Sequence, residues 1–175
     1  RLHTGDPSIY GAIREQMNEL DKLGIEYEVV PGVSSFQAAA AALKAELTAP
    51  EVAQTIILSR AAGRTKVPER QRLDRLAETQ ATLCLFLSVG QIDVFSQTLM
   101  HHYGNDCPVA VVFHASWPDQ SIVRGTLEDI SSKVHSQRIE KTAMIIVGRA
   151  LAPGNPYSKL YDSGFSHGYR KGTDL

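Results

Sequence analysis

A nearly unbroken apolar run at residues 81–87, Ala-Thr-Leu-Cys-Leu-Phe-Leu, limits the folds that this 175-residue chain can adopt. A strand that is apolar on both faces must be covered on both faces, which is typical of the central strands of α/β sheets. Similar runs at 108–113 and 142–148 are separated from it by segments with helical spacing, including 92–103. This alternation predicts an α/β fold.

Weaker patterns complete the expected order of elements. Apolar residues at helical spacing predict a helix from 9 to about 23, ending before Gly24. The segment Leu47–Pro50 interrupts the pattern, so we expect two α/β domains, residues 1–50 and residues 51–175. Arg1 falls within an expected strand, so we expect a chain whose first domain is truncated. Further strands are expected at 25–30, 54–60 and 121–127, and further helices at 36–45, 69–79 and 127–134, the last capped by Thr126.

Two turns stand where expected strands end and helices begin. The first is Gly5-Asp6-Pro7, and the second runs from Pro31 through Gly32 and Val33 to Ser34 and Ser35. Open α/β sheets bind small ligands in the crevice outside the carboxyl ends of their strands. Because Gly-Asp-Pro turns are common, the first turn taken alone favours a turn without a ligand. The two turns together predict a binding crevice.

Composition argues against several classes of partner. The net charge is −1 and the basic residues are scattered, so we expect no nucleic-acid partner. No apolar stretch reaches the length of a membrane span, so we expect no membrane partner. Cys84 and Cys107 are the only cysteines, and two buried thiols in a reducing compartment are favoured over a disulfide. These features predict a cytoplasmic protein.

No catalytic group or metal site can be recognised in the sequence. His101 and His102 are adjacent on an expected helix, and His114, His135 and His167 are each isolated, so no metal-ligand spacing is present. There is no Gly-x-Ser-x-Gly nucleophile elbow and no phosphate-binding Gly-Lys-Ser/Thr loop. A crevice without a nucleophile or metal suits a group-transfer enzyme whose reacting centres both belong to ligands.

These motifs resemble the tetrapyrrole (uroporphyrin-III/precorrin) methylase family of cobalamin biosynthesis over the whole chain. The Gly-Asp-Pro and Pro-Gly-Val turns are similar to the family's, and the segments Ala115–Asp119 and Ser158–Asp162 resemble the members that methylate C11 of precorrin-4 or cobalt-precorrin-4. The resemblance implies two α/β domains with S-adenosyl-L-methionine (SAM) in the crevice between them, S-adenosyl-L-homocysteine as product, and a homodimer. A methylase acting at another ring position and an inactive dimerising fragment are the alternatives.

The resemblance also implies site residues. For SAM these are Thr4, Gly5 and Asp6 in the first turn, Ser34 and Ser35 in the second, Phe86 and Leu87, and the small residues Ala110 and Ala143. Leu87 departs from the methionine that the family often has there. Simple strand packing is the alternative for both alanines.

For the tetrapyrrole carboxylates we expect Arg60 and Arg64, because guanidinium groups bind carboxylates bidentately. Solvated surface arginines are the alternative. Trp117 is expected in the core or at a dimer contact in preference to a shelf for the macrocycle. No residue is nominated as a general base.

Overall fold

The fold is built on a five-stranded mixed sheet, seen here in a computed structural model that describes residues 1–62, 66–158, 162–166 and 168–171. The strand order is β1-β2-β5-β3-β4. β1 and β2 are parallel, whereas β5 is antiparallel to both β2 and β3. The α/β class expected from the sequence is therefore confirmed. The strands are β1 (Ile56–Arg60), β2 (Thr82–Phe86), β3 (Pro108–Phe113), β4 (Ser121–Thr126) and β5 (Ala143–Val147).

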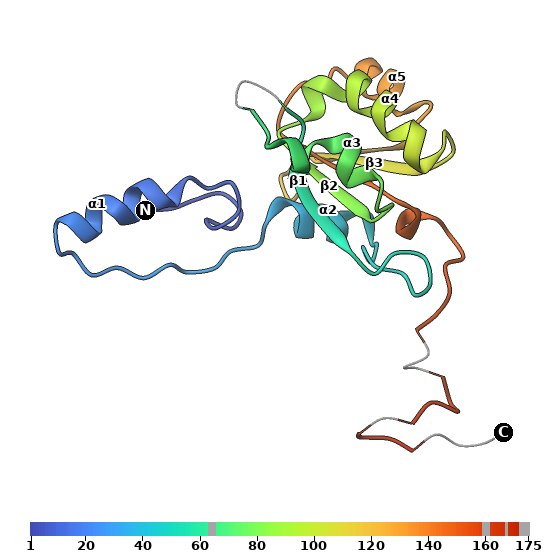
Figure 1. Ribbon diagram of the computed structural model, residues 1–175, viewed down its shortest axis with the longest axis horizontal. Helices are drawn as coiled ribbons and strands as arrows, with labels where there is room; N and C mark the ends of the chain where they lie inside the picture. The colour runs from blue at the N-terminus through green and yellow to red at the C-terminus, as the bar shows by residue number, and fades with distance from the viewer. Residues whose placement is uncertain (63–65, 159–161, 167, 172–175) are drawn as a thin grey trace.

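The three central strands are buried on both faces by helices (Figure 1). One face carries α3 (Leu73–Ala77), α4 (Ile92–Tyr103) and α5 (Ile130–Ser136), and the other carries α2 (Ser35–Leu43). In β2, for example, Leu83 and Leu85 pack toward the three-helix face, whereas Cys84 and Phe86 pack toward α2. This two-sided cover explains why the run at 81–87 is apolar at nearly every position.

α2 lies against the sheet through its small side chains. Ala39 has no exposed surface, and Leu43 at the end of the helix is also buried. Both contact a cluster that includes Ala110 of β3 and Ile146 of β5. Alanine brings the helix close to the strands because it has no side chain beyond Cβ. Residues 44–55 connect α2 to β1.

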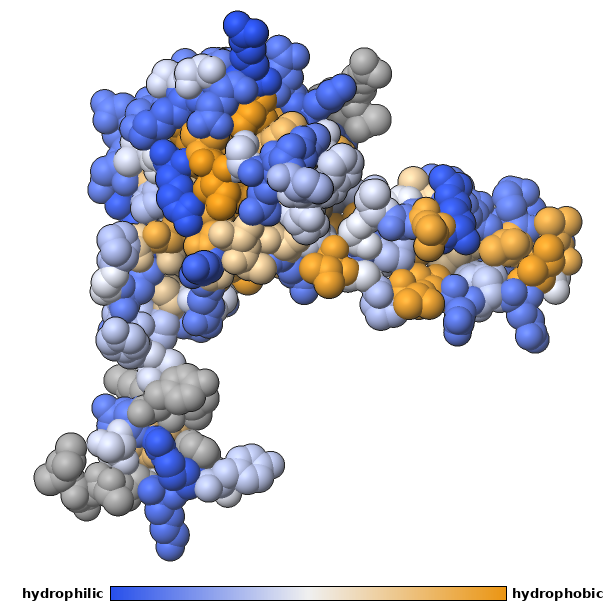
Figure 2. All heavy atoms as spheres, turned by 180° about the vertical axis from the view of Figure 1, so that it is seen from behind, coloured by the Kyte–Doolittle hydropathy of each residue, from blue (hydrophilic) through white to orange (hydrophobic). Residues whose placement is uncertain are grey.

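The N-terminal 33 residues form an arm that extends from the body of the molecule (Figure 1). Its helix, α1 (Ile13–Lys22), has no buried residue. The prediction of a strand at 25–30 is wrong, because this segment is extended but pairs with no strand in the described residues. Apolar side chains gather on the arm (Figure 2), among them Leu2, Leu23, Val30 and Val33.

Several expected element boundaries are also wrong. The first helix begins at Ile13 rather than residue 9, because Tyr10 and Ala12 adopt left-handed backbone angles (φ 55° and 50°). Residues 69–79 divide into the 3₁₀ turn Glu69–Gln71 and α3, since Arg72 between them is extended. α5 begins at Ile130, and Thr126 instead donates its backbone N–H to the Asp129 carboxylate over 2.8 Å.

The remaining 3₁₀ turns, Val89–Gln91 and Arg149–Leu151, follow the carboxyl ends of β2 and β5. In the described part of the chain, no helix has the length and apolar character needed to cross a membrane.

Candidate functional site

A crevice of about 670 Å³ opens along one edge of the sheet, meaning the line formed by the ends of neighbouring strands. β2 and β3 end at this edge, and the antiparallel strand β5 begins there. Residues after β2 and β3, residues before β5, the first turn of α2 and the base of the arm line the crevice. Three neighbouring strands and two turns therefore converge on one cavity, whose size is ordinary for a small-molecule site.

The two sequence turns meet through Asp6. One carboxylate oxygen accepts the backbone N–H of Ser8 over 2.8 Å and also the Ser8 hydroxyl, and the other accepts the backbone N–H of Gly32 over 3.0 Å. The Ser8 hydroxyl, followed by the Gly32 amide, holds the pKa of the Asp6 carboxyl below its usual range. A Cβ at position 32 would lie 2.2 Å from the carbonyl oxygen of Gly5, so only glycine permits this approach.

An apolar wall faces the turns. The rings of Tyr10 and Phe86 contact each other with centroids 4.9 Å apart. Leu87, the residue after β2, is 79% exposed although it is aliphatic, and it lines the crevice. An exposed apolar side chain inside a cavity is suited to contact an apolar part of a ligand.

Left-handed backbone angles concentrate around the crevice. Five of its lining residues have positive φ although none is glycine: Tyr10 (55°), Leu87 (53°), His114 (46°), Ser116 (72°) and Thr142 (55°). Such residues cost of order 1 kcal/mol each and persist where the surrounding structure holds them. Their concentration supports a functional role for this edge of the sheet.

The segment after β3 forms the polar side of the crevice. The His114 ring stacks on Phe113 with centroids 3.6 Å apart and lies 4.5 Å from the Trp117 ring. Its Nδ1 bonds the Asp119 carboxylate over 2.8 Å, so His114 is not isolated as the sequence suggested. Trp117 is 54% exposed and lines the crevice, so it is not a core residue.

Seven of the nine residues expected to contact SAM line this crevice. Ser34, which does not, is buried at the start of α2, where its N–H donates to Gln37 Oε1 over 3.0 Å. Ala110 also lies elsewhere, in a second cavity. The seven are Thr4, Gly5, Asp6, Ser35, Phe86, Leu87 and Ala143.

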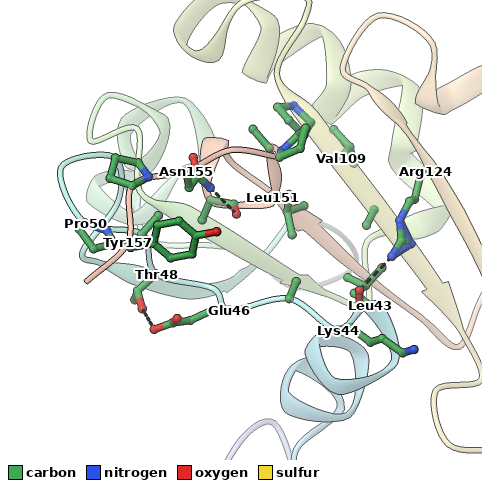
Figure 3. Close-up of a pocket in the computed structure, with 18 of the residues that line it drawn as sticks. Leu43, Lys44, Glu46, Thr48, Pro50, Val109, Arg124, Leu151, Asn155 and Tyr157 are labelled. Atoms are coloured by element: carbon green, nitrogen blue, oxygen red, sulfur yellow. Dashed lines mark hydrogen bonds between the residues drawn. The ribbon is translucent and has the colours of Figure 1, made fainter. Parts of the chain in front are cut away.

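The second cavity, of about 760 Å³, lies at the opposite edge of the sheet, where β3 begins and β4 ends. Figure 3 shows Arg124 directed toward the end of α2, where its guanidinium donates to the carbonyl oxygen of Leu43 over 3.0 Å. Tyr157, in the C-terminal segment, lies across the cavity from Arg124 (Figure 3). Arg124 thus links α2 to β4.

Arg60 lies beside the crevice rather than in it. It is the last residue of β1, in register with Phe86 of β2. Its guanidinium donates to the carbonyl oxygens of Ala61 (3.3 Å) and Lys66 (3.4 Å), and it lines a third cavity of about 410 Å³. Burial raises the pKa of Tyr10, and the positive charge of Arg60 acts in the opposite direction, so the two residues are close. Arg64 falls outside the described residues.

In the part of the chain that the structure describes, there is no reactive thiol and no metal cluster. Burial raises the pKa of Cys84 to about 12 and that of Cys107 to about 11, and both are free thiols. Among the described residues, no group of three or more His, Cys, Asp or Glu side chains could hold a metal ion.

Sequence reasoning missed the segment from His114 to Trp117 as part of the site, along with Tyr10 and Lys141. One available signal was that residues 114–117 follow a buried strand, as Leu87 does. The antiparallel direction of β5, which brings residues 140–144 to the same edge, left no comparable signal.

The family profile described as Tetrapyrrole (Corrin/Porphyrin) Methylases matches residues 1–131, about three quarters of the chain. The chain belongs to the tetrapyrrole methylase family. It is 57% identical over 173 residues to the cobalt-precorrin-4 C(11)-methyltransferase of Methanocaldococcus jannaschii, covering 98% of this chain and 67% of that protein. This chain therefore has a relative of high sequence identity that is named as a methyltransferase.

Two solved tetrapyrrole methylases share the fold. A cobalt precorrin-4 methyltransferase, described as a cobalamin biosynthetic enzyme, has a TM-score of 0.85 and 48% identity, covering 87% of this chain and 64% of that one. The Thermus thermophilus uroporphyrin-III C-methyltransferase in complex with S-adenosyl homocysteine has a TM-score of 0.66 and 25% identity, covering 84% and 64%. The chain thus spans about two thirds of the length of its relatives.

Proposed function

We propose that this chain belongs to an enzyme that transfers a methyl group from SAM to C11 of precorrin-4 or cobalt-precorrin-4 in cobalamin biosynthesis. The observation that carries the proposal is the 57% identity to a relative named for that reaction. The crevice at the sheet edge supports it, because most of the residues expected at the cofactor site come together there from distant parts of the chain.

The crevice fits SAM in size and in chemistry. Its volume of about 670 Å³ lies within the range of 300–1,000 Å³ that is usual for small-molecule sites. The backbone at Thr4–Asp6 and at Ser35 offers polar contacts for a ribose and an amino-acid group. Phe86, Leu87 and Tyr10 offer apolar contact for the remaining parts. We therefore assign the cofactor to this crevice.

When bound, SAM supplies an electrophilic methyl group on a sulfonium, so the protein need not generate one. The residues of this chain then have to place the acceptor carbon in line with that methyl and exclude water. Positioning of this kind can lower a barrier by about 7–11 kcal/mol. The close approach of Gly5 and Gly32 and the exposed Leu87 are suited to that placement.

Binding of the cofactor and identity of the product test the proposal. Isothermal titration of the 175-residue chain with S-adenosyl-L-homocysteine should release heat with one site per chain. A chain extended to the length of its relatives should methylate precorrin-4, with or without cobalt, and carbon NMR should place the new methyl at C11. A methyl at another ring carbon would favour a different member of the family. Binding only by the extended chain would indicate an inert fragment.

We propose that Arg60 contacts the tetrapyrrole carboxylates, together with Arg64, which follows four residues later in the sequence. In the extended enzyme, Arg60→Ala should raise KM for the tetrapyrrole and lower kcat/KM. The loss of transition-state stabilisation that corresponds to the lower kcat/KM should be roughly 1–3 kcal/mol. It should leave the affinity for S-adenosyl-L-homocysteine nearly unchanged, because SAM has no cluster of carboxylates. Arg70→Ala, an exposed arginine on the neighbouring 3₁₀ turn, is the matched control. Loss of cofactor binding with unchanged tetrapyrrole kinetics would place Arg60 at the cofactor instead.

A further inference from the structure

The proposed methyl transfer leaves a proton to be removed. The acceptor carbon forms a bond to the methyl group while the carbon–sulfur bond breaks and its electron pair stays on sulfur. The methylated macrocycle then carries a positive charge, which it loses when a proton departs from a ring nitrogen or carbon. A base in the crevice would accept that proton, and general bases contribute roughly 10²–10⁴-fold in rate.

Among the described residues, four titratable groups other than histidine line the crevice, and each is poorly suited to this task. The carboxylate of Asp6 already accepts three hydrogen bonds from Ser8 and Gly32. Tyr10 is a phenol whose pKa burial raises, so it holds its proton. Glu140 is exposed to water, and Lys141 is an exposed cation.

His114 differs from these groups in how it is held. Its Nδ1 bonds Asp119 Oδ2 over 2.8 Å, and its side chain is only 18% exposed. The carboxylate accepts and cannot donate, so Nδ1 carries the proton and the lone pair of the neutral ring lies on Nε2. In the described part of the chain, Nε2 has no hydrogen-bond partner.

The backbone and the neighbouring rings fix this imidazole in place. His114 has a positive φ of 46°, and its ring is packed against Phe113 and Trp117. An imidazole oriented by a carboxylate and presented at the edge of a cavity is the usual arrangement of a general base. We propose that His114, oriented by Asp119, accepts the proton released in the methyl transfer at this crevice.

This inference rests on the proposed function, and kinetics in the extended enzyme provide its first test. His114→Asn is the variant of choice, because asparagine tolerates a positive φ and its amide can still donate to Asp119. We expect kcat for methyl transfer to fall roughly 100-fold or more, with S-adenosyl-L-homocysteine affinity within about threefold of wild type. His101→Gln, on the exposed side of α4, is the matched control and should leave kcat unchanged.

The pH profile separates a proton acceptor from a merely structural residue. Wild-type kcat should rise with pH as the imidazole loses its proton, and His114→Asn should lose this inflection. Added imidazole should partly restore the rate of a His114→Gly variant. An unchanged inflection and a kcat within about threefold in His114→Asn would overturn the proposal.

A measurement without turnover distinguishes failure of this inference from failure of the proposed function. Nitrogen NMR of the neutral His114 ring should show a protonated Nδ1 and an unprotonated Nε2, and bound S-adenosyl-L-homocysteine should shift the Nε2 signal. A protonated Nε2, or a signal that the ligand does not move, would overturn the inference even if the enzyme methylates its substrate. If no tetrapyrrole is methylated although both NMR results hold, the proposed substrate is at fault.

Discussion

At the scale of single residues, Asp6 joins two parts of the crevice. Its carboxylate bonds the turn that contains it and also the amide of Gly32, which is 26 residues away. The resemblance to methylases implied that Asp6 contacts SAM directly, and that role stays a prediction. The structure adds a second role, because the Asp6 carboxylate sets the spacing of the two turns that would border the ligand.

Asp6→Ala should therefore weaken the binding of S-adenosyl-L-homocysteine by about 10-fold to 100-fold, the effect expected when a charged hydrogen bond is lost. The folded-state pKa of Asp6 is lowered, so its stabilising effect is present above the unfolded pKa of about 3.9 and is lost as pH falls through the lower folded value. Isothermal titration at neutral pH measures the affinity. Glu28→Ala, which removes the same charge from an exposed part of the arm, is the control and should bind normally. Equal affinities of the two variants would remove Asp6 from the site.

At the scale of elements, α2 connects the crevice to the core. Its first turn, including Ser35 and Ala38, lines the crevice, while Ala39 and Leu43 pack against β3 and β5. The helix begins directly after the Pro-Gly-Val turn that Asp6 holds. The close packing of α2 on the sheet therefore fixes the position of its first turn beside the crevice.

Ala39→Leu should lower the free energy of unfolding by about 1–3 kcal/mol, because the added carbons have no space between α2 and the sheet. Ala41→Leu, two residues further along the same helix and exposed, should change stability by no more than about 0.5 kcal/mol. Urea unfolding followed by circular dichroism measures both. If the two variants are equally stable, α2 does not dock on the sheet as described.

At the scale of the whole molecule, the arm exposes apolar surface that single domains usually cover. Leu2 is 99% exposed, and Val30 and Val33 are 69% and 68% exposed. Large apolar surfaces of this kind mark contacts with other protein segments. The homodimer that the resemblance implies stays a prediction.

Sedimentation of the extended protein at micromolar concentration should give the mass of a dimer. Replacing Trp117, which is half-exposed at the crevice, by alanine tests whether this residue belongs to the contact. We expect the dimer to persist in Trp117→Ala if the ring belongs to the crevice, and to dissociate if it belongs to the interface. A monomer at all concentrations in the wild-type protein would contradict the homodimer.

The sequence by itself determined the elements that are buried on both faces. The ranges of α4 and β3 agree with expectation at both ends, because a central strand shows its burial as a continuous apolar run and its covering helix as apolar residues at helical spacing. The two glycine turns likewise indicated the crevice, since the need for close backbone approach shows in residue type. Segments without such local signals, such as the extended residues 25–30 and the delayed start of α1, were predicted wrongly.

Only the tertiary structure decided which residues meet at the site. The antiparallel insertion of β5 between β2 and β3 brings Ala143 to the same edge as Phe86, while Ala110 falls at the opposite edge because it lies near the start of β3. The pairing of His114 with Asp119 likewise depends on a left-handed bend after β3. Strand direction and backbone reversals are set by contacts between distant segments, and a local residue pattern does not contain them.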